Sequence, residues 1–346
     1  MEQYRAVGLS VAVVKNNELI YNRSFGYSNL EHKTKLKNKN IFRIASISKS
    51  FSASSIMQLA EAGKLSLDDD FSKLVGFTIR NPKYPDDVIT LRMVLSHTSS
   101  INDSQGYFNL DVINPGKNTN WAGCYNDYRP GAGYQYCNLN FNMVGAVIER
   151  LSGERFDQYV LHHILQPLQL YGGYCVDSLD QSLFATLYEY DTVSQQFTAA
   201  AAAYHPRRDE ISNYVMGYST PVFSPTGGMK ISAHDLAGYM KMHMNKGAVG
   251  NTRIISEQSS VTMQTPLSKD ENYGLALWTT NIFIPGKTLV GHTGSAYGLY
   301  STMFFSPEEK FGLVLITNGC NGAYKEGWNE FLHAAALTLY NRLISQ

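Results

Sequence analysis

Short runs rich in β-branched and aromatic residues lie at both ends of the chain, and this arrangement constrains the fold more than any other feature of the sequence. Residues 6–14 and 19–21 flank a turn at Asn16-Asn17 and predict an opening β-hairpin. Three more strands are predicted near the other end, at residues 289–294, 299–306 and 311–318. Strands at both ends with helices between them predict an α/β (α+β) fold, in which helices flank one antiparallel sheet built from both chain termini.

Helical spacing dominates the chain between these strands. A helix is predicted to begin near Ser46 and to end at Gly63. Further helices are predicted at residues 91–95, 141–151 and 156–165, and a last amphipathic one at residues 328–343. We therefore expect a sheet domain made of residues 1–65 plus 223–346, with residues 66–222 inserted as a mainly helical domain. A substrate site is expected in the cleft between the two parts.

The charge balance restricts the class of partner. The chain has 29 Lys and Arg against 29 Asp and Glu, which gives a formal net charge of zero. Binding nucleic acid requires a basic surface, so no nucleic-acid partner is expected. No uncharged apolar stretch reaches the roughly 18–20 residues of a membrane span. The apolar run at residues 6–14 leads into a charged turn without a cleavage site, so no signal peptide is predicted in this sequence. The oligomeric state stays open.

The cysteines give no support for a metal site. Cys124, Cys137, Cys175 and Cys320 form no C-x-x-C pair and have no histidine at zinc-ligand spacing. We predict neither a metal nor a cofactor. An even number of cysteines permits disulfides with three connectivities, whereas free buried cysteines are the favoured interpretation.

Ser46 and Lys49 form a candidate nucleophile and base. They are three positions apart, so on a helix they share one face. A serine hydroxyl is a poor nucleophile until a base accepts its proton, and a lysine can be that base once burial lowers its pKa. A helix N-terminus also points backbone N–H groups to where an oxyanion would form. The alternative is a Ser-x-x-Lys pair on a solvated helix face.

Further motifs, in order, give the chain a family resemblance. Ser46-x-x-Lys49 resembles the nucleophile motif of the penicillin-recognising serine enzymes, which include class C β-lactamases and penicillin-binding proteins. Tyr136-Cys137-Asn138 resembles their Tyr-x-Asn motif in its Pro-Gly setting, and His292-Thr293-Gly294 stands where the family has Lys-Thr-Gly. With the segments between them, the resemblance covers essentially the whole chain. It implies a β-lactamase/transpeptidase-like fold.

The resemblance also implies three catalytic residues. Ser46 would form an acyl-enzyme, while Lys49 and Tyr136 would move the protons of Ser46 and the leaving group. Tyr-x-Asn also occurs at Tyr27 and Tyr107, but only Tyr136 has the Pro-Gly lead-in and a helix behind it. Lys49 is expected to favour the Tyr136 anion. A structural tyrosine is the alternative.

A substrate-binding set follows from the same resemblance. Asn138 would contact Lys49 and donate its amide to the substrate, although an ordinary helix N-cap is compatible with that position. His292, Thr293 and Gly294 would border the substrate on a strand. The backbone amide of Ser295 would be the second oxyanion donor beside that of Ser46. If this strand recognises a substrate carboxylate, protonated His292 is expected to hold it better than the neutral form.

The function implied by the resemblance is that of a serine hydrolase or acyltransferase. Its substrates would be peptidoglycan-like D-alanyl peptides, β-lactams, small esters or D-amino-acid amides. Histidine at position 292 is similar to carboxypeptidase- and esterase-like members, so an efficient β-lactamase is less expected. The alternative is a non-catalytic penicillin- or peptidoglycan-binding or sensing protein on the same scaffold. The family's cell-envelope substrates imply a periplasmic or secreted location.

Overall fold

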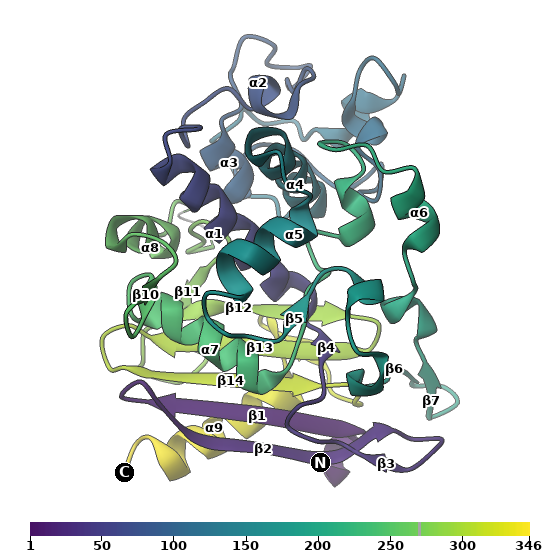
Figure 1. Ribbon diagram of the computed structural model, residues 1–346, viewed down its shortest axis with the longest axis vertical. Helices are drawn as coiled ribbons and strands as arrows, with labels where there is room; N and C mark the ends of the chain where they lie inside the picture. Colours follow the sequence, from purple (N-terminus) through teal and green to yellow (C-terminus); the bar gives the residue numbers. More distant parts are fainter. Residues whose placement is uncertain (269–270) are drawn as a thin grey trace.

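Both ends of the chain contribute to one large antiparallel sheet. The computed structural model, shown in Figure 1, describes residues 1–268 and 271–346. The strand order is β11-β12-β13-β14-β1-β2-β3. Its members are β1 (Gly8–Lys15), β2 (Glu18–Asn29), β3 (Thr34–Lys35), β11 (Trp278–Thr280), β12 (Leu289–Ala296), β13 (Leu299–Ser306) and β14 (Phe311–Thr317). β1 pairs with β14 from Leu9 opposite Thr317 to Lys15 opposite Phe311. The predicted fold class, with a sheet built from both termini, is confirmed.

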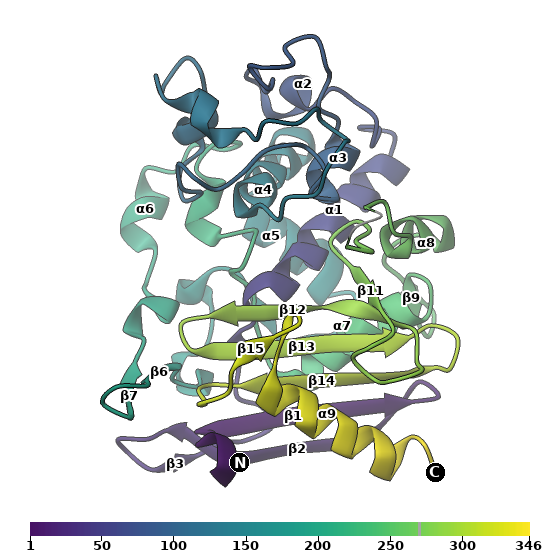
Figure 2. The same cartoon turned by 180° about the vertical axis from the view of Figure 1, so that it is seen from behind.

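Helices cover both faces of this sheet. α7 (Ala233–Met244) packs on one face against β1, β13 and β14, and α9 (Glu330–Leu343) packs on the other against β13 and β14. Figure 2 shows α9 crossing the face that is hidden in Figure 1. Side chains of a strand point alternately to the two faces. Accordingly Val11 and Val13 join the core beneath α9, whereas Ala12 and Val14 join the larger core.

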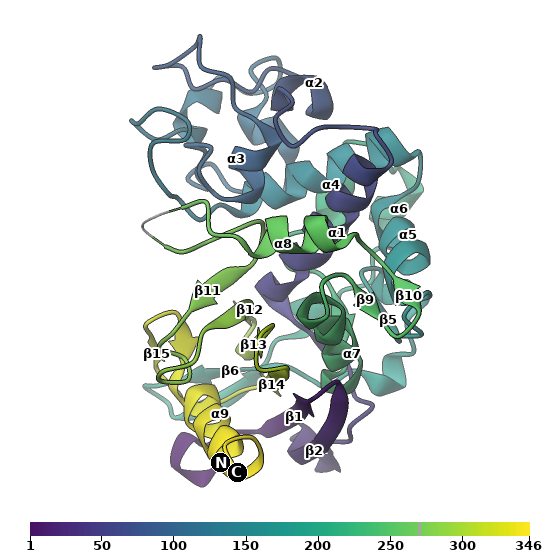
Figure 3. The same ribbon diagram turned by 90° about the vertical axis from the view of Figure 1, so that its left-hand side faces the viewer.

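The remaining helices lie mainly on the α7 side, above the edge of the sheet that carries β12 (Figure 3). They are α1 (Ser48–Glu61), α2 (Phe71–Val75), α3 (Leu91–Leu95), α4 (Asn138–Ser152), α5 (Phe156–Val160), α6 (Arg208–Ser212) and α8 (Glu257–Gln264). α1 packs against α4 and α5, and ten or more of its side chains are buried. α1 is therefore a core helix, and the turn before it carries Ser46.

Short strands tie these parts together. A three-stranded sheet of order β4-β8-β5 joins β4 (Phe42–Arg43), β8 (Lys230–Ile231) and β5 (Gly172–Gly173). The other short strands are β6 (Tyr188–Asp191), β7 (Gln196–Ala199), β9 (Ala248–Val249), β10 (Thr252–Arg253), β15 (Tyr324–Lys325) and β16 (Trp328–Asn329). β5 lies within residues 66–222, the range expected to form the inserted helical domain, yet it pairs with β8, which lies outside that range. The division of the chain at residues 66–222 therefore stays a prediction.

Two helix boundaries differ from the sequence prediction for a physical reason. α4 begins at Asn138 rather than at residue 141, because the Asp103 carboxylate accepts the backbone N–H groups of Asn138 and Leu139. α9 begins at Glu330 rather than at residue 328, because the Asn329 side chain accepts the first amides of the helix.

Two further expectations concern the cysteines and the membrane. All four cysteines are buried and free, so the favoured interpretation is confirmed. Among residues 1–268 and 271–346, no helix combines the length and the apolar character that crossing a membrane requires.

Candidate active site

Ser46 lies in a tight turn between β4 and α1. Residues Ala45–Ile47 form one turn of 3₁₀-helix that leads into α1. Ala45 has a φ of 52°, in the left-handed region that costs free energy for a residue with a side chain. Strand β12 runs against this turn so closely that a Cβ on Gly294 would lie 2.3 Å from the Ile44 carbonyl oxygen. Gly294 therefore allows the contact that holds the turn and presents Ser46 to the pocket.

Lys49 lies one turn further along and is fully buried. Its Nζ is 3.0 Å from Ser46 Oγ, 2.9 Å from Asn138 Oδ1 and 3.0 Å from the Thr226 carbonyl oxygen. Burial lowers the pKa of Lys49 to about 7, although the nearby Asp103 charge acts in the opposite direction. A large share of the amine is thus neutral at neutral pH and can accept a proton from Ser46.

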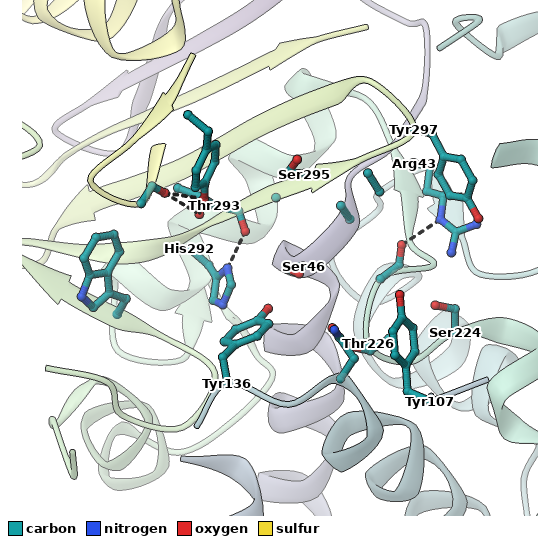
Figure 4. A pocket seen from close by; sticks show the side chains of 18 of the residues that line it. Arg43, Ser46, Tyr107, Tyr136, Ser224, Thr226, His292, Thr293, Ser295 and Tyr297 are labelled. Carbon is teal, nitrogen blue, oxygen red and sulfur yellow. Dashed lines mark hydrogen bonds between the residues drawn. The ribbon is translucent and has the colours of Figure 1, made fainter. Parts of the chain in front are cut away.

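Tyr136 lies beside Ser46 in the pocket (Figure 4). Its ring centroid is 4.7 Å from Lys49 Nζ. Burial raises the pKa of Tyr136 well above its usual 10, with the neighbouring Ser46 hydroxyl acting the other way. The expectation that Lys49 favours the phenolate is therefore not met. Tyr136 keeps its proton, and Lys49 is the better base of the two.

Asn138 is held by a carboxylate that the sequence analysis did not single out. Asp103 accepts hydrogen bonds from the backbone N–H of Asn138 at 2.8 Å and from its Nδ2 at 2.9 Å. This orients the Asn138 amide so that Oδ1 faces Lys49 and also accepts the Thr226 hydroxyl at 2.8 Å. Asn138 therefore contacts Lys49 as expected, while at least one of its amide hydrogens is directed to Asp103 rather than to the pocket.

His292 has both ring nitrogens occupied within the protein. Nδ1 lies 2.5 Å from the Thr293 carbonyl oxygen, and Nε2 lies 3.0 Å from the Tyr273 hydroxyl. Because a carbonyl can only accept, Nδ1 carries the proton and Nε2 accepts from Tyr273. Burial lowers the pKa of His292 to about 3, with the Lys49 charge adding to the effect. His292 is therefore neutral across the physiological range and does not supply the expected cation for a carboxylate.

One pocket of about 820 Å³ brings the predicted residues together. It is lined by Ser46, Tyr136, Asn138, His292, Thr293, Gly294 and Ser295, while Lys49 lies beneath them. Figure 4 shows Ser46 with His292 and Tyr136 on one side and Arg43, Tyr107 and Tyr297 on the other. Thr293 Oγ1 donates to the Gly327 carbonyl oxygen at 3.1 Å, so it is anchored to the loop before β16. The oxyanion role of the Ser295 amide stays a prediction.

Arg43 and Thr226 also contribute to this pocket without having been assigned a role from sequence. Arg43 stands three positions before Ser46. Thr226 is the first residue of a Thr-Gly-Gly segment. Within the part of the chain that the structure describes, no group of three or more His, Cys, Asp or Glu side chains could hold a metal ion.

The chain is similar to known proteins in sequence and in fold. The family model described as Beta-lactamase matches residues 1–337. Protein flp from Staphylococcus aureus (strain MW2) is 25% identical over 332 residues, which cover 90% of this chain and 59% of that protein. The chain thus spans less than two thirds of the length of the curated relatives it matches most strongly.

Solved structures show the same fold. The octameric penicillin-binding protein homologue from Pyrococcus abyssi has a TM-score of 0.76 and 27% identity, with 97% of this chain and 74% of that one covered. The D-amino acid amidase from Ochrobactrum anthropi SV3, complexed with D-phenylalanine, has a TM-score of 0.69 and 19% identity, with 91% and 87% covered. At such identity the second likeness concerns the fold alone.

Proposed function

The chain belongs to the beta-lactamase family, and from this premise we propose that it is a serine hydrolase that forms an acyl-enzyme on Ser46. The observation that carries the proposal is the 3.0 Å contact between Ser46 Oγ and Lys49 Nζ, a buried amine whose pKa is lowered to about 7 by its burial. A nucleophile with an adjacent base of suitable pKa is the arrangement that acyl transfer requires. The family supports a periplasmic or secreted location.

Lys49 and Tyr136 each carry out part of the proton transfers that such a reaction requires. Neutral Lys49 accepts the Ser46 proton while Oγ forms a bond to the substrate carbonyl carbon, and the carbonyl electron pair moves to oxygen. The backbone N–H groups of Ser46 and Ser295 are the proposed donors to that oxyanion. When the tetrahedral intermediate collapses, Tyr136 donates its proton to the leaving group and regains one from the Lys49 ammonium. Water then attacks the Ser46 ester and releases the acid.

The charge of the site favours some of the family's substrates over others. A D-alanyl peptide or a β-lactam carries a carboxylate in the part that binds beyond the scissile bond, and the family's lysine would pair with it. Here that position holds a neutral His292. We therefore propose esterase-like or amidase-like action, with small esters and amides ahead of D-alanyl peptides and β-lactams.

The test is covalent labelling by a fluorophosphonate and by a fluorescent penicillin, read by intact mass and peptide mapping. We expect the fluorophosphonate to add to Ser46 and the Ser46→Ala variant to stay unlabelled. The pocket holds two other serines, Ser224 and Ser295, so mapping distinguishes the three. Labelling at Ser224 or Ser295 would contradict the assignment. Reversible penicillin binding with no adduct from either probe would support the non-catalytic alternative.

A further inference from the structure

Arg43 is a buried cation in the pocket that no acid of the described chain neutralises. Its side chain is 7% exposed, lines the pocket, and takes part in none of the ion pairs formed by residues 1–268 and 271–346. Nε donates to the Gly227 carbonyl oxygen at 3.0 Å and Nη1 to the Ala203 carbonyl oxygen at 3.5 Å. No hydrogen bond from Nη2 to a described residue is present. A guanidinium has five donors, so more than half of them are available to a ligand.

The surroundings of Arg43 keep this cation in place. The Tyr297 ring lies 5.0 Å from the guanidinium carbon, at cation–π distance. Tyr297 has a φ of 56° in the turn between β12 and β13, a conformation that is strained for a bulky residue. The next residue, Gly298, fixes that turn, since a Cβ there would lie 1.9 Å from the Tyr188 carbonyl oxygen. The strained turn thus holds an aromatic ring against Arg43.

The charged groups nearest to Arg43 do not offset its charge. Burial lowers the pKa of Arg43 below its usual 12.5, the hydroxyls of Tyr297 and Tyr204 act in the opposite direction, and a second cation, Arg207, adds to the lowering. An arginine remains charged at neutral pH after such a shift. Glu189 lines this side of the pocket from β6, but it is exposed at the rim and forms no ion pair with Arg43.

The position of Arg43 relative to Ser46 identifies the part of the substrate that it can meet. Arg43 donates to the Gly227 carbonyl while Lys49 donates to that of Thr226, so one segment holds both side chains beside the nucleophile. Figure 4 shows Arg43 on the side of Ser46 away from Tyr136. Tyr136 has to reach the leaving-group atom, so the leaving group lies on its side. The acyl chain therefore extends toward Arg43.

The opposite end of the pocket has the opposite charge. Glu271 and Glu326 line it near His292, and both are exposed. Among the described residues that line this end, the titratable groups are these two acids, tyrosines and the neutral His292. An anionic leaving group would be repelled there, whereas an anion on the acyl side would be attracted to Arg43.

We propose that Arg43 binds a carboxylate on the acyl portion of the substrate. The preferred substrates are esters or amides of a dicarboxylic acid, with one carboxyl group free and an uncharged or cationic leaving group. This substrate class rests on the proposed function of Ser46. The available N–H groups of Arg43 can engage both oxygens of a carboxylate, and the buried setting strengthens such a pair relative to water.

The test compares two 4-nitrophenyl esters of adipic acid. In 4-nitrophenyl hydrogen adipate the second carboxyl group is free and charged, and in 4-nitrophenyl methyl adipate it is a neutral methyl ester. We expect kcat/KM for the anionic ester to exceed that for the neutral ester by on the order of ten- to a hundredfold in the wild type, as one charged hydrogen-bonded pair provides. The Arg43→Gln variant should bring this ratio to about one or below, and Arg43→Lys should retain part of it. Because each protein is judged by the ratio of its two kcat/KM values, a loss of activity that affects both esters equally does not change the result.

The matched control is Arg23→Gln, which makes the same charge change on β2, outside the pocket lining. It should keep the wild-type ratio. A second substrate pair moves the anion to the leaving group: 4-acetoxybenzoate should be a poorer substrate than its methyl ester. A wild-type adipate ratio of one or less, or a ratio unchanged by Arg43→Gln, would overturn the proposal.

Measuring ligand binding to the wild type tests the Arg43 site without depending on catalysis or on the folding of a variant. Calorimetry on the wild type should give at least tenfold tighter binding for adipamate than for hexanamide, which lacks the carboxylate. Equal binding would overturn the Arg43 site even if Ser46 is labelled and the neutral ester is hydrolysed. If adipamate binds selectively but Ser46 is not labelled and neither ester is turned over, the acyl-enzyme proposal fails while the anion site stands.

Discussion

At the scale of single residues, the site depends on the charge states of Lys49 and Tyr136. The lysine is poised to lose its proton near neutral pH, and the phenol holds its own well above that range. Neither state follows from the residue types, since free lysine and free tyrosine have pKa values of about 10. Burial of both groups against Ser46 produces the difference, and burial depends on the whole fold.

Lys49 and Tyr136 should behave as one unit in mutagenesis. Lys49→Ala and Tyr136→Phe should each slow acylation of Ser46 on the order of 10²-fold or more, the range for acid–base groups. The double variant should lose little beyond the worse single one, because Tyr136 regains from Lys49 the proton that it gives to the leaving group, so the two groups form one proton relay. The check is the acylation rate with 4-nitrophenyl acetate in a stopped-flow burst. Losses that multiply would show independent roles.

Asp103 should tune the base through its charge. Its carboxylate raises the pKa of Lys49 against the larger effect of burial. Replacing it in Asp103→Asn removes that charge, so the pKa of Lys49 should fall and the rise of activity with pH should move to lower pH. The measurement is kcat/KM for a neutral ester between about pH 5 and 9, with Asp127→Asn at an exposed ion pair as the control. A midpoint that stays in place or moves upward would exclude this role.

At the scale of elements, the sequence predicted the strands of the sheet and the main helices because their signals are local. The hairpin of β1 and β2, the strands β12 to β14 and the helix after Ser46 all follow from side-chain periodicity and turn residues. The start of α4 did not, since its capping carboxylate on Asp103 is 35 positions away from Asn138. The charge state of His292 was also out of reach, because its burial and the nearby Lys49 charge set it.

Gly294 links the element β12 to the nucleophile, and it should not tolerate a side chain. In Gly294→Ala the new Cβ would lie 2.3 Å from the Ile44 oxygen and 2.5 Å from Ser301 Oγ. The strand has to move away from the Ala45 turn, so we expect a loss of about 1–3 kcal/mol of stability and a loss of activity of at least tenfold.

The matched control for this change is Gly173→Ala on β5. A Cβ there would meet only Leu179 Cδ2 at 3.7 Å, an ordinary contact. Thermal unfolding and kcat/KM measured on both variants decide the matter. If Gly294→Ala is as stable and as active as Gly173→Ala, the close approach of β12 does not position Ser46.

At the scale of the whole molecule, the sheet joins residues near the two ends of the chain without covalent cross-links. β1 and β14 pair along their lengths, and the four cysteines are buried and free. The melting temperature should therefore be the same with and without dithiothreitol, and alkylation of the native protein should be slow at all four thiols. A melting temperature that falls in reductant would show a disulfide and contradict the free-thiol structure.

The sequence motifs predicted which residues lie together in the pocket, whereas the burial and the charge of those residues depend on the whole fold. Ser46, Lys49, Tyr136 and the β12 residues were identifiable because they stand in a recognisable order. The proposed substrate preference was not, since it rests on Arg43 at one end of the pocket and a neutral histidine at the other. Those properties arise only when segments far apart in sequence enclose the same pocket.

The most direct test of the central claim, that buried Lys49 activates Ser46, is the pH dependence of Ser46 labelling by an uncharged fluorophosphonate from about pH 5 to 9. Burial lowers the pKa of His292, the histidine that lines the pocket, to about 3, so it does not titrate in this range. The second-order rate constant should rise about tenfold per pH unit below pH 7 and level off above it, following the neutral fraction of Lys49. A rate that is flat across the range, or that still climbs at pH 9 as with an ordinary lysine, would contradict the account.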